Sequence, residues 1–350
     1  MLVGSVVTGN SEIASLRPVR CHSGGEMDKK NYADPVPVAG GGIAPSGAEP
    51  KDRAVTGFIQ KLSGLVLTNL PRPLLNVVLR GMRQELPPKA VGVEVNVTQT
   101  IHDGVTVTWL ARDNHSRGVV VYLPGGLYVA GPVAPQWKWL AEIQRRTGFA
   151  TATVCYRKPP EHPHPAALDD VVAVVRSLHQ AGELTEGNWV LAGDSAGGHL
   201  ALAACQQLRD AGGPLPAGLL LTAPVVDMEF AHPPTAAAIQ ADPTTTDATF
   251  WWGFKLYANG TPFSDPSLSA INASLNDLPP VHLNVGTRDL FLFDNRRLVE
   301  RLKQSGVDVT YVEQQDAKHA YPLRTHTPEA QWAIRDQIGW LQEITNPSRD

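Results

Sequence analysis

A serine between two glycines is the residue of this chain best suited to chemistry. Ser195 stands in a G-x-S-x-G pattern with Gly193 and Gly197, after the apolar run 189–192 and before a helix-forming run. A sharp strand-to-helix turn leaves no room for side chains beside the serine and exposes its hydroxyl. The helix N-terminus can stabilise negative charge at the same point. The pattern therefore predicts a nucleophile, with a helix-capping serine as the alternative.

A serine hydroxyl needs a histidine base that is itself oriented by a carboxylate. When the serine lies on such a turn, the acid and then the histidine follow it along the chain. Asp289 comes after the strand-like run 281–286, and His319 comes after the strand-like run 309–313. We therefore expect a catalytic triad of Ser195, Asp289 and His319. Asp294 is a rival acid, but we expect it to cap the next helix.

Acyl transfer also needs N–H donors where the oxyanion develops. Gly125 and Gly126 follow the apolar run 118–123, and no side chain hinders their N–H groups. Ala196 directly follows the expected nucleophile. We expect these three residues to form an oxyanion hole, with a plain glycine turn as the alternative.

The segments that must position these residues alternate between strand and helix patterns. We expect strands over 118–123, 149–155, 188–193, 218–222, 281–285 and 309–313, and helices over 137–147, 166–180, 196–211, 294–305 and after residue 328. A hairpin is expected over 91–113, turning at 102–104. This order predicts an α/β fold with a mostly parallel, doubly wound sheet, and we assign 91–350 to the catalytic domain.

Three stretches fall outside this alternation. Residues 1–50 are rich in glycine and proline and are expected to be a disordered tail. Residues 51–90 carry apolar side chains at three- and four-residue spacing, which predicts two helices split at 71–73. A long insertion spans 227–280 after Asp227. The helices and the insertion are expected to form a helical cap, or else to be packed structure without a role at the site.

Aromatic side chains make the insertion a candidate pocket wall. Trp251, Trp252 and Tyr257 lie within it, while Leu127 and Tyr128 directly follow the oxyanion glycines. The five residues are candidates for the substrate pocket. A helix that buries its aromatic face is the alternative, and both interpretations can hold for different side chains.

Composition narrows the classes of function. The 350 residues are 43% hydrophobic and carry a net charge of −4, which suits a large folded core and gives no case for a nucleic-acid partner. Three scattered cysteines, no clear signal peptide and no stretch long enough to span a membrane predict a cytoplasmic protein. The oligomeric state stays open, homo-oligomers included.

The charged stretch 156–170 resembles a metal or acid/base site at first sight. It holds Arg157, Lys158, Glu161, His162 and His164 among several prolines. The histidines lack cysteines or further ligands at suitable spacing. We therefore interpret the charges as ion pairs that hold an extended crossover, and we expect neither a metal nor a cofactor.

Ordered motifs over 119–341 resemble the hormone-sensitive-lipase-like family of α/β-hydrolases, which are bacterial and fungal serine esterases. Residues 193–201 read G-D-S-A-G-G-H-L-A, close to the family's G-D-S-A-G-G-N-L-A. Residues 156–170 follow its Y-R-L-A-P-E-x-P-x-P-A-A-x-x-D, and 265–269 and 278–280 match its D-P-x-x-S and L-P-P. The family's H-G-G-G is here Pro124-Gly125-Gly126-Leu127, which changes the shape of the oxyanion segment.

This resemblance implies a serine carboxylesterase that hydrolyses small to medium, relatively hydrophobic esters through an acyl-enzyme. The side chain of Leu127 is expected to shorten the acyl pocket. An amidase or deacetylase with the same triad is the second interpretation. A ligand-binding protein, as in the plant gibberellin receptors, is the third, but such receptors typically lose the base, whereas His319 is present here.

Overall fold

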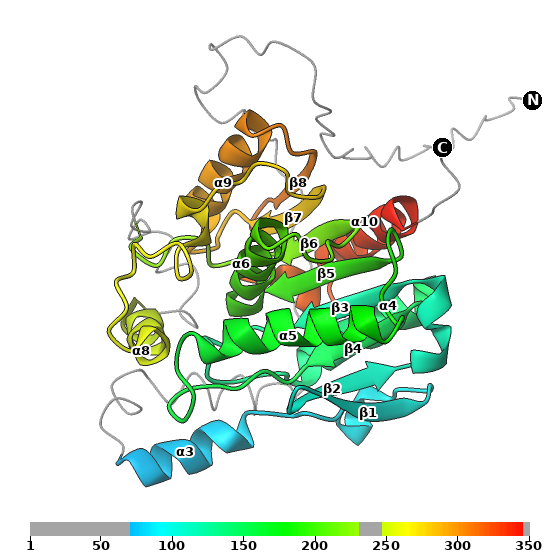
Figure 1. The fold of residues 1–350 in the computed structure, drawn as a ribbon, viewed down its shortest axis with the longest axis horizontal. Helices are drawn as coiled ribbons and strands as arrows, with labels where there is room; N and C mark the ends of the chain where they lie inside the picture. Colours follow the sequence, from blue (N-terminus) through cyan, green and yellow to red (C-terminus); the bar gives the residue numbers. More distant parts are fainter. Residues whose placement is uncertain (1–70, 231–246, 346–350) are drawn as a thin grey trace, which may run out of the picture.

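An eight-stranded sheet forms the centre of the computed structural model, which describes residues 71–230 and 247–345 (Figure 1). The strands lie in the order β1-β2-β4-β3-β5-β6-β7-β8. They are β1 (Val97–His102), β2 (Val105–Leu110), β3 (Val119–Leu123), β4 (Ala150–Val154), β5 (Trp189–Asp194), β6 (Gly218–Thr222), β7 (Val281–Gly286) and β8 (Val309–Gln314). Among the described strands, the pairs β1–β2 and β2–β4 are antiparallel and the other pairs are parallel. The expected hairpin and the mostly parallel sheet are confirmed.

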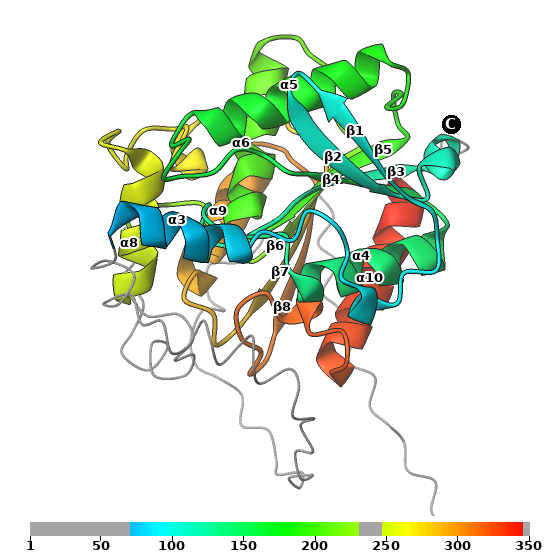
Figure 2. The same ribbon diagram turned by 90° about the horizontal axis from the view of Figure 1, so that it is seen from below.

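Helices cover both faces of this sheet, which Figure 2 shows from below. On one face lie α5 (Ala166–Gln180), α6 (Ala196–Asp210) and α9 (Leu292–Gln304), and on the other lie α4 (Ala134–Thr147) and α10 (Pro328–Ile344). Side chains alternate along each strand. On β3, for example, Val119 and Val121 enter the core under α5 and α6, while Val120 and Tyr122 enter the core under α4 and α10.

Two further helices, α3 (Arg72–Gly81) and α8 (Asp247–Ala258), lie side by side at one end of the molecule (Figures 1 and 2). Leu75 and Leu79 of α3 pack with Trp252 and Leu256 of α8 and with Val129. The second of the two expected N-terminal helices is therefore α3. The first one, the tail over 1–50 and part of the insertion lie outside the described residues.

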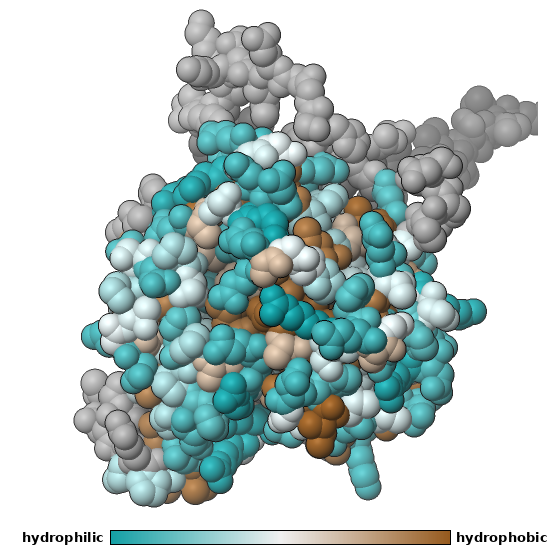
Figure 3. All heavy atoms as spheres, in the orientation of Figure 1, coloured by the Kyte–Doolittle hydropathy of each residue, from teal (hydrophilic) through white to brown (hydrophobic). Residues whose placement is uncertain are grey.

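Short 3-10 helices complete the described chain: η1 (Lys89–Val91), η2 (Arg112–Arg117), η3 (Ala270–Asn272) and η4 (Tyr321–Leu323). The face seen in Figure 3 is mostly hydrophilic, with hydrophobic residues in separated groups. Among residues 71–230 and 247–345, no helix combines the length and the apolar character needed to cross a membrane.

Candidate active site

Ser195 lies in a strained turn between β5 and α6. Its φ of 52° and ψ of −119° fall where L-residues are uncommon. A Cβ on Gly193 would lie 2.3 Å from the carbonyl oxygen of Gly197, and a Cβ on Gly197 would lie 1.9 Å from that of Leu123. Both positions therefore require glycine. The Ser195 side chain makes no capping bond to the described first turn of α6, so the helix-cap alternative finds no support.

Asp289 and His319 meet at the edge of the sheet where β5, β7 and β8 end. His319 Nδ1 lies 2.9 Å from Oδ2 and 3.1 Å from Oδ1 of Asp289, whose side chain is fully buried. Parallel strands bring their carboxyl ends to one edge, which is also where Ser195 lies. A Cβ on Gly286 would lie 2.2 Å from the carbonyl oxygen of Ala317. The end of β7 and the histidine loop are thus in close contact.

Two phenylalanines frame the imidazole of His319, and sequence reasoning did not identify them as site residues. The ring centroid of Phe291 lies 5.4 Å from that of His319, and the centroid of Phe250 lies 6.3 Å away, both nearly edge to face. The backbone N–H of Phe291 also donates to Asp289 Oδ1 at 3.0 Å. The only sequence signal for Phe291 is its place two residues after the acid. Together these rings cover part of the imidazole, whose side chain is 14% exposed, and restrict its orientation.

Asp294 has a different environment from the one expected. Helix α9 begins at Leu292 with Phe291 at the N-cap position, so Asp294 lies inside the first turn and the predicted N-cap role is wrong. The side chain is buried at 1% exposure. The pKa of Asp294 is raised to about 7, mainly by burial and also by the charge of Asp227, while the charge of Arg297 acts in the opposite direction. The carboxylate that contacts His319 Nδ1 is that of Asp289.

The structure corrects one of the expected oxyanion donors. The N–H of Gly125 donates to Asp194 Oδ1 at 2.9 Å, so it is not available to a substrate. Among the described residues, no backbone hydrogen bond outside the regular elements uses the N–H of Gly126 or Leu127. Ala196 is the first residue of α6, where helical N–H groups have no partner within the helix. Gly126, Leu127 and Ala196 are therefore the candidate donors.

The five candidate pocket residues separate into two groups. Tyr128 and Tyr257 are fully buried and stack ring on ring, with centroids 3.9 Å apart. Their assignment to the pocket wall is corrected, because tertiary stacking places them in the interior. Trp251 and Trp252 stay partly exposed. Leu127 packs in the cluster that joins α3 to α8, and these three residues remain candidates.

The charged crossover between β4 and α5 is held by ion pairs, as expected. Arg157 Nη2 lies 2.7 Å from Asp170 Oδ1, and its backbone N–H donates to the same carboxylate at 2.7 Å. Glu161 lies 3.3 Å from Arg80 Nη2 and 3.6 Å from Arg83 Nη2. The first pair fixes the crossover on α5, and the others attach α3 to it.

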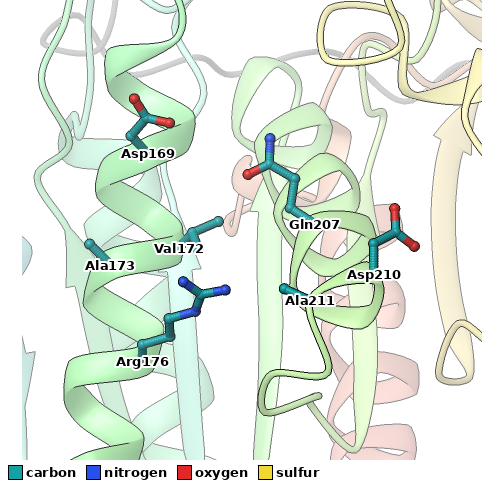
Figure 4. A pocket seen from close by; sticks show the side chains of 7 residues that line it. All are labelled: Asp169, Val172, Ala173, Arg176, Gln207, Asp210 and Ala211. Carbon is teal, nitrogen blue, oxygen red and sulfur yellow. The ribbon is translucent and has the colours of Figure 1, made fainter.

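A separate open groove lies between α5 and α6 (Figure 4). Its lining residues are Asp169, Val172, Ala173, Arg176, Gln207, Asp210 and Ala211. None of the three expected catalytic residues is among them. The groove is therefore distinct from the candidate active site.

A mostly parallel sheet with a strained serine after one strand and an Asp–His pair after two later ones defines a hydrolase of the α/β class. The sequence profile of the alpha/beta hydrolase fold family matches residues 120–323, and the chain belongs to this family. The expected fold class is thus confirmed.

Individual relatives of the chain are esterases and an acetyl-hydrolase. The chain is 34% identical over 243 residues to an acetyl-hydrolase of Streptomyces hygroscopicus, covering 69% of this chain and 80% of the relative. It is 31% identical over 266 residues to the carboxylesterase NlhH of Mycobacterium tuberculosis, with the same coverage. A crystal structure of an esterase from the bacterial hormone-sensitive lipase family matches with a TM-score of 0.69 at 28% identity, covering 86% of this chain and all of the other. The expected family resemblance is confirmed.

Proposed function

We propose that Ser195, His319 and Asp289 act as a serine-hydrolase triad in this chain. The observation that carries the proposal is the pair of contacts at 2.9 and 3.1 Å between Asp289 and His319, at the same sheet edge as the strained Ser195. The relatives support the class of reaction: this protein is a carboxylic ester hydrolase. The paired base also favours hydrolysis over a role in ligand binding alone.

The reaction follows from these positions. Ser195 Oγ attacks the ester carbonyl while His319 Nε2 takes the hydroxyl proton, and Asp289 stabilises the imidazolium through Nδ1–H. The N–H groups of Gly126, Leu127 and Ala196 stabilise the oxyanion. His319 then gives the proton to the departing alcohol. Water, activated by the same base, cleaves the acyl-enzyme and restores Ser195.

Short acyl groups are the proposed substrates. Two supports are the printed name of the Streptomyces relative, an acetyl-hydrolase, and the side chain of Leu127 where the resembled family carries glycine. Trp252 packs with Leu127 and α3, while Trp251 packs against the main core, and both are partly exposed and so able to contact a substrate. Assays with p-nitrophenyl esters of graded chain length measure this preference.

A fluorophosphonate probe combined with Ser195→Ala tests the proposal. Wild type should be labelled at Ser195 and hydrolyse p-nitrophenyl acetate, whereas Ser195→Ala should lose labelling and about three or more orders of magnitude in kcat. Unchanged melting of the variant shows that the loss is chemical. Ester hydrolysis near the wild-type rate in Ser195→Ala would remove the proposed nucleophile.

The proposed location is the cytoplasm. Cys155 and Cys205 are unbonded thiols, which suits a reducing compartment. Cell fractionation tests the location, and analytical ultracentrifugation tests whether the protein forms the homo-oligomer that the sequence left open.

A further inference from the structure

A buried carboxylate lies directly beneath the oxyanion loop. Asp194 precedes the nucleophile and is 4% exposed. It accepts hydrogen bonds from the hydroxyl of Tyr122, from the N–H of Gly125 at 2.9 Å and from Nε2 of Gln136 at 3.0 Å. Burial raises the pKa of Asp194, and these three hydrogen bonds oppose the shift. A buried carboxylate needs such donors, so its position depends on all three.

Gln136 uses both ends of its amide in this network. Nε2 donates to Asp194 and, at 3.3 Å, to the carbonyl oxygen of Gly125. Oε1 accepts the N–H of Val133 at 2.8 Å, at the start of α4. The residue is 2% exposed. One side chain therefore connects the first turn of α4, the nucleophile turn and the loop that carries the oxyanion donors.

We propose that Gln136 is a positioning residue for the oxyanion hole and acts through Asp194 and Gly125. With its N–H held by Asp194 and its C=O held by Gln136, the peptide unit on each side of Gly125 is fixed. The N–H of Gly126 belongs to the second of these units, so its direction is set by the contact with Gln136. This proposal rests on the triad mechanism above.

Three variants test it in the full-length enzyme. Gln136→Met removes donor and acceptor at similar length, and Gln136→Glu keeps the acceptor for Val133 but replaces the donor by a carboxyl group. Gln144→Met is the matched control, since Gln144 is also buried on α4 and its side chain has no hydrogen bond to the described residues. The number of active sites is counted as the amount of serine labelled by fluorophosphonate when the labelling is complete, and rates are divided by this number. Partial unfolding of a variant then lowers the count of active sites but does not change kcat.

The expected result for Gln136→Met is a loss of about 10- to 100-fold in kcat and in kcat/KM with KM nearly unchanged, because a displaced donor weakens the transition state only. Gln144→Met should stay within about two-fold of wild type. If wild type is labelled at Ser195 and Gln136→Met keeps its kcat, the positioning role is wrong while the triad stands. If wild type is not labelled, the triad itself fails.

Gln136→Glu separates positioning of the loop from simple capping of α4, and it carries the test if Gln136→Met does not fold. The groups facing the introduced carboxyl group would be the Asp194 carboxylate and the Tyr122 hydroxyl, with the charge of His319 acting on Asp194. The proposal is supported if kcat is low. It is also supported if kcat recovers only at falling pH, where the introduced carboxyl group can share a proton with Asp194. Full kcat across neutral and alkaline pH overturns it, since the acceptor alone would then suffice.

Discussion

Replacing Asp289 by asparagine should invert the hydrogen bond that orients the base. Oδ1 of Asp289 accepts the N–H of Phe291 at 3.0 Å, so the amide oxygen of an asparagine should occupy that position. Its NH2 group then takes the place of Oδ2, the oxygen 2.9 Å from His319 Nδ1. An N–H directed at Nδ1 forces the ring proton onto Nε2. A protonated Nε2 cannot accept the proton of Ser195.

The expected loss is large because the charge and the tautomer are both lost. We expect kcat/KM of Asp289→Asn to fall by about 10³- to 10⁴-fold, which corresponds to about 4–5.5 kcal/mol of transition-state stabilisation. Melting should change little, since the bond from Phe291 is kept. The assay is hydrolysis of p-nitrophenyl butyrate over a range of pH, alongside thermal unfolding.

Asp294→Asn is the matched control, because it removes a second buried carboxylate five residues further along the chain. The Nδ1 of His319 is held by Asp289, so the contact that orients the base stays in place when the Asp294 carboxylate is replaced. Activity should therefore stay within about two-fold of wild type. Loss of activity in Asp294→Asn together with retention in Asp289→Asn would refute the assignment of the acid.

The remaining predictions concern stability and specificity. Gly197→Ala should lower both the melting temperature and the activity, because its Cβ would lie 1.9 Å from a carbonyl oxygen. Gly339→Ala in α10 has nothing within 4 Å of the added Cβ, so it should raise the free energy of unfolding in urea by about 0.5–1 kcal/mol. The folded-state pKa of Asp294 is raised to about 7 from 3.8, so its contribution to stability is present at acid pH and is lost as pH rises toward 7. Asp294→Asn should flatten the melting temperature over that window, and an unchanged slope would contradict the shift. Leu127→Gly should lower the melting temperature, because packing with α3 and α8 is lost. It should also extend the acyl chain length that is hydrolysed in a series of p-nitrophenyl esters. A wild-type preference for long acyl chains would contradict this second effect.

The proposed triad could be assembled from the sequence because each of its residues has a local signal. Glycine is required at 193 by the contact with Gly197 in the same turn, and at 197 by the close approach to the carbonyl oxygen of Leu123. Both requirements appear in the sequence as the G-x-S-x-G spacing. Asp289 and His319 follow apolar strands, and parallel strands end at one edge. Strand and helix periodicity also predicted the sheet and α3, the second of the expected N-terminal helices. These inferences depend on near neighbours in sequence or on the regular geometry of the sheet.

The features that sequence reasoning missed depend on partners far along the chain. The N–H of Gly125 is taken by Asp194, 69 residues away, and glycine itself gives no sign of this. Tyr128 and Tyr257 looked like pocket residues by type, but they stack on each other across separate elements. Phe250 approaches His319 only because α8 folds back over the site. No spacing in the sequence encodes such contacts.

The leucine at 127, where the resembled family has glycine, connects the proposed oxyanion loop to helices α3 and α8. The backbone of Leu127 has a φ of 54°, which costs a leucine more than a glycine, and its side chain packs against α3 and α8. The same loop is held by the segment after α3 through Arg83 Nε to the carbonyl of Val129 at 3.1 Å and through the N–H of Gly131 to the carbonyl of Met82 at 3.0 Å. Side-chain packing and these two bonds offset the backbone cost and restrict a segment that glycine would leave freer. Changes in α3 and α8 should therefore alter the catalytic rate as well as the size of substrate accepted, because both depend on residues 125–131.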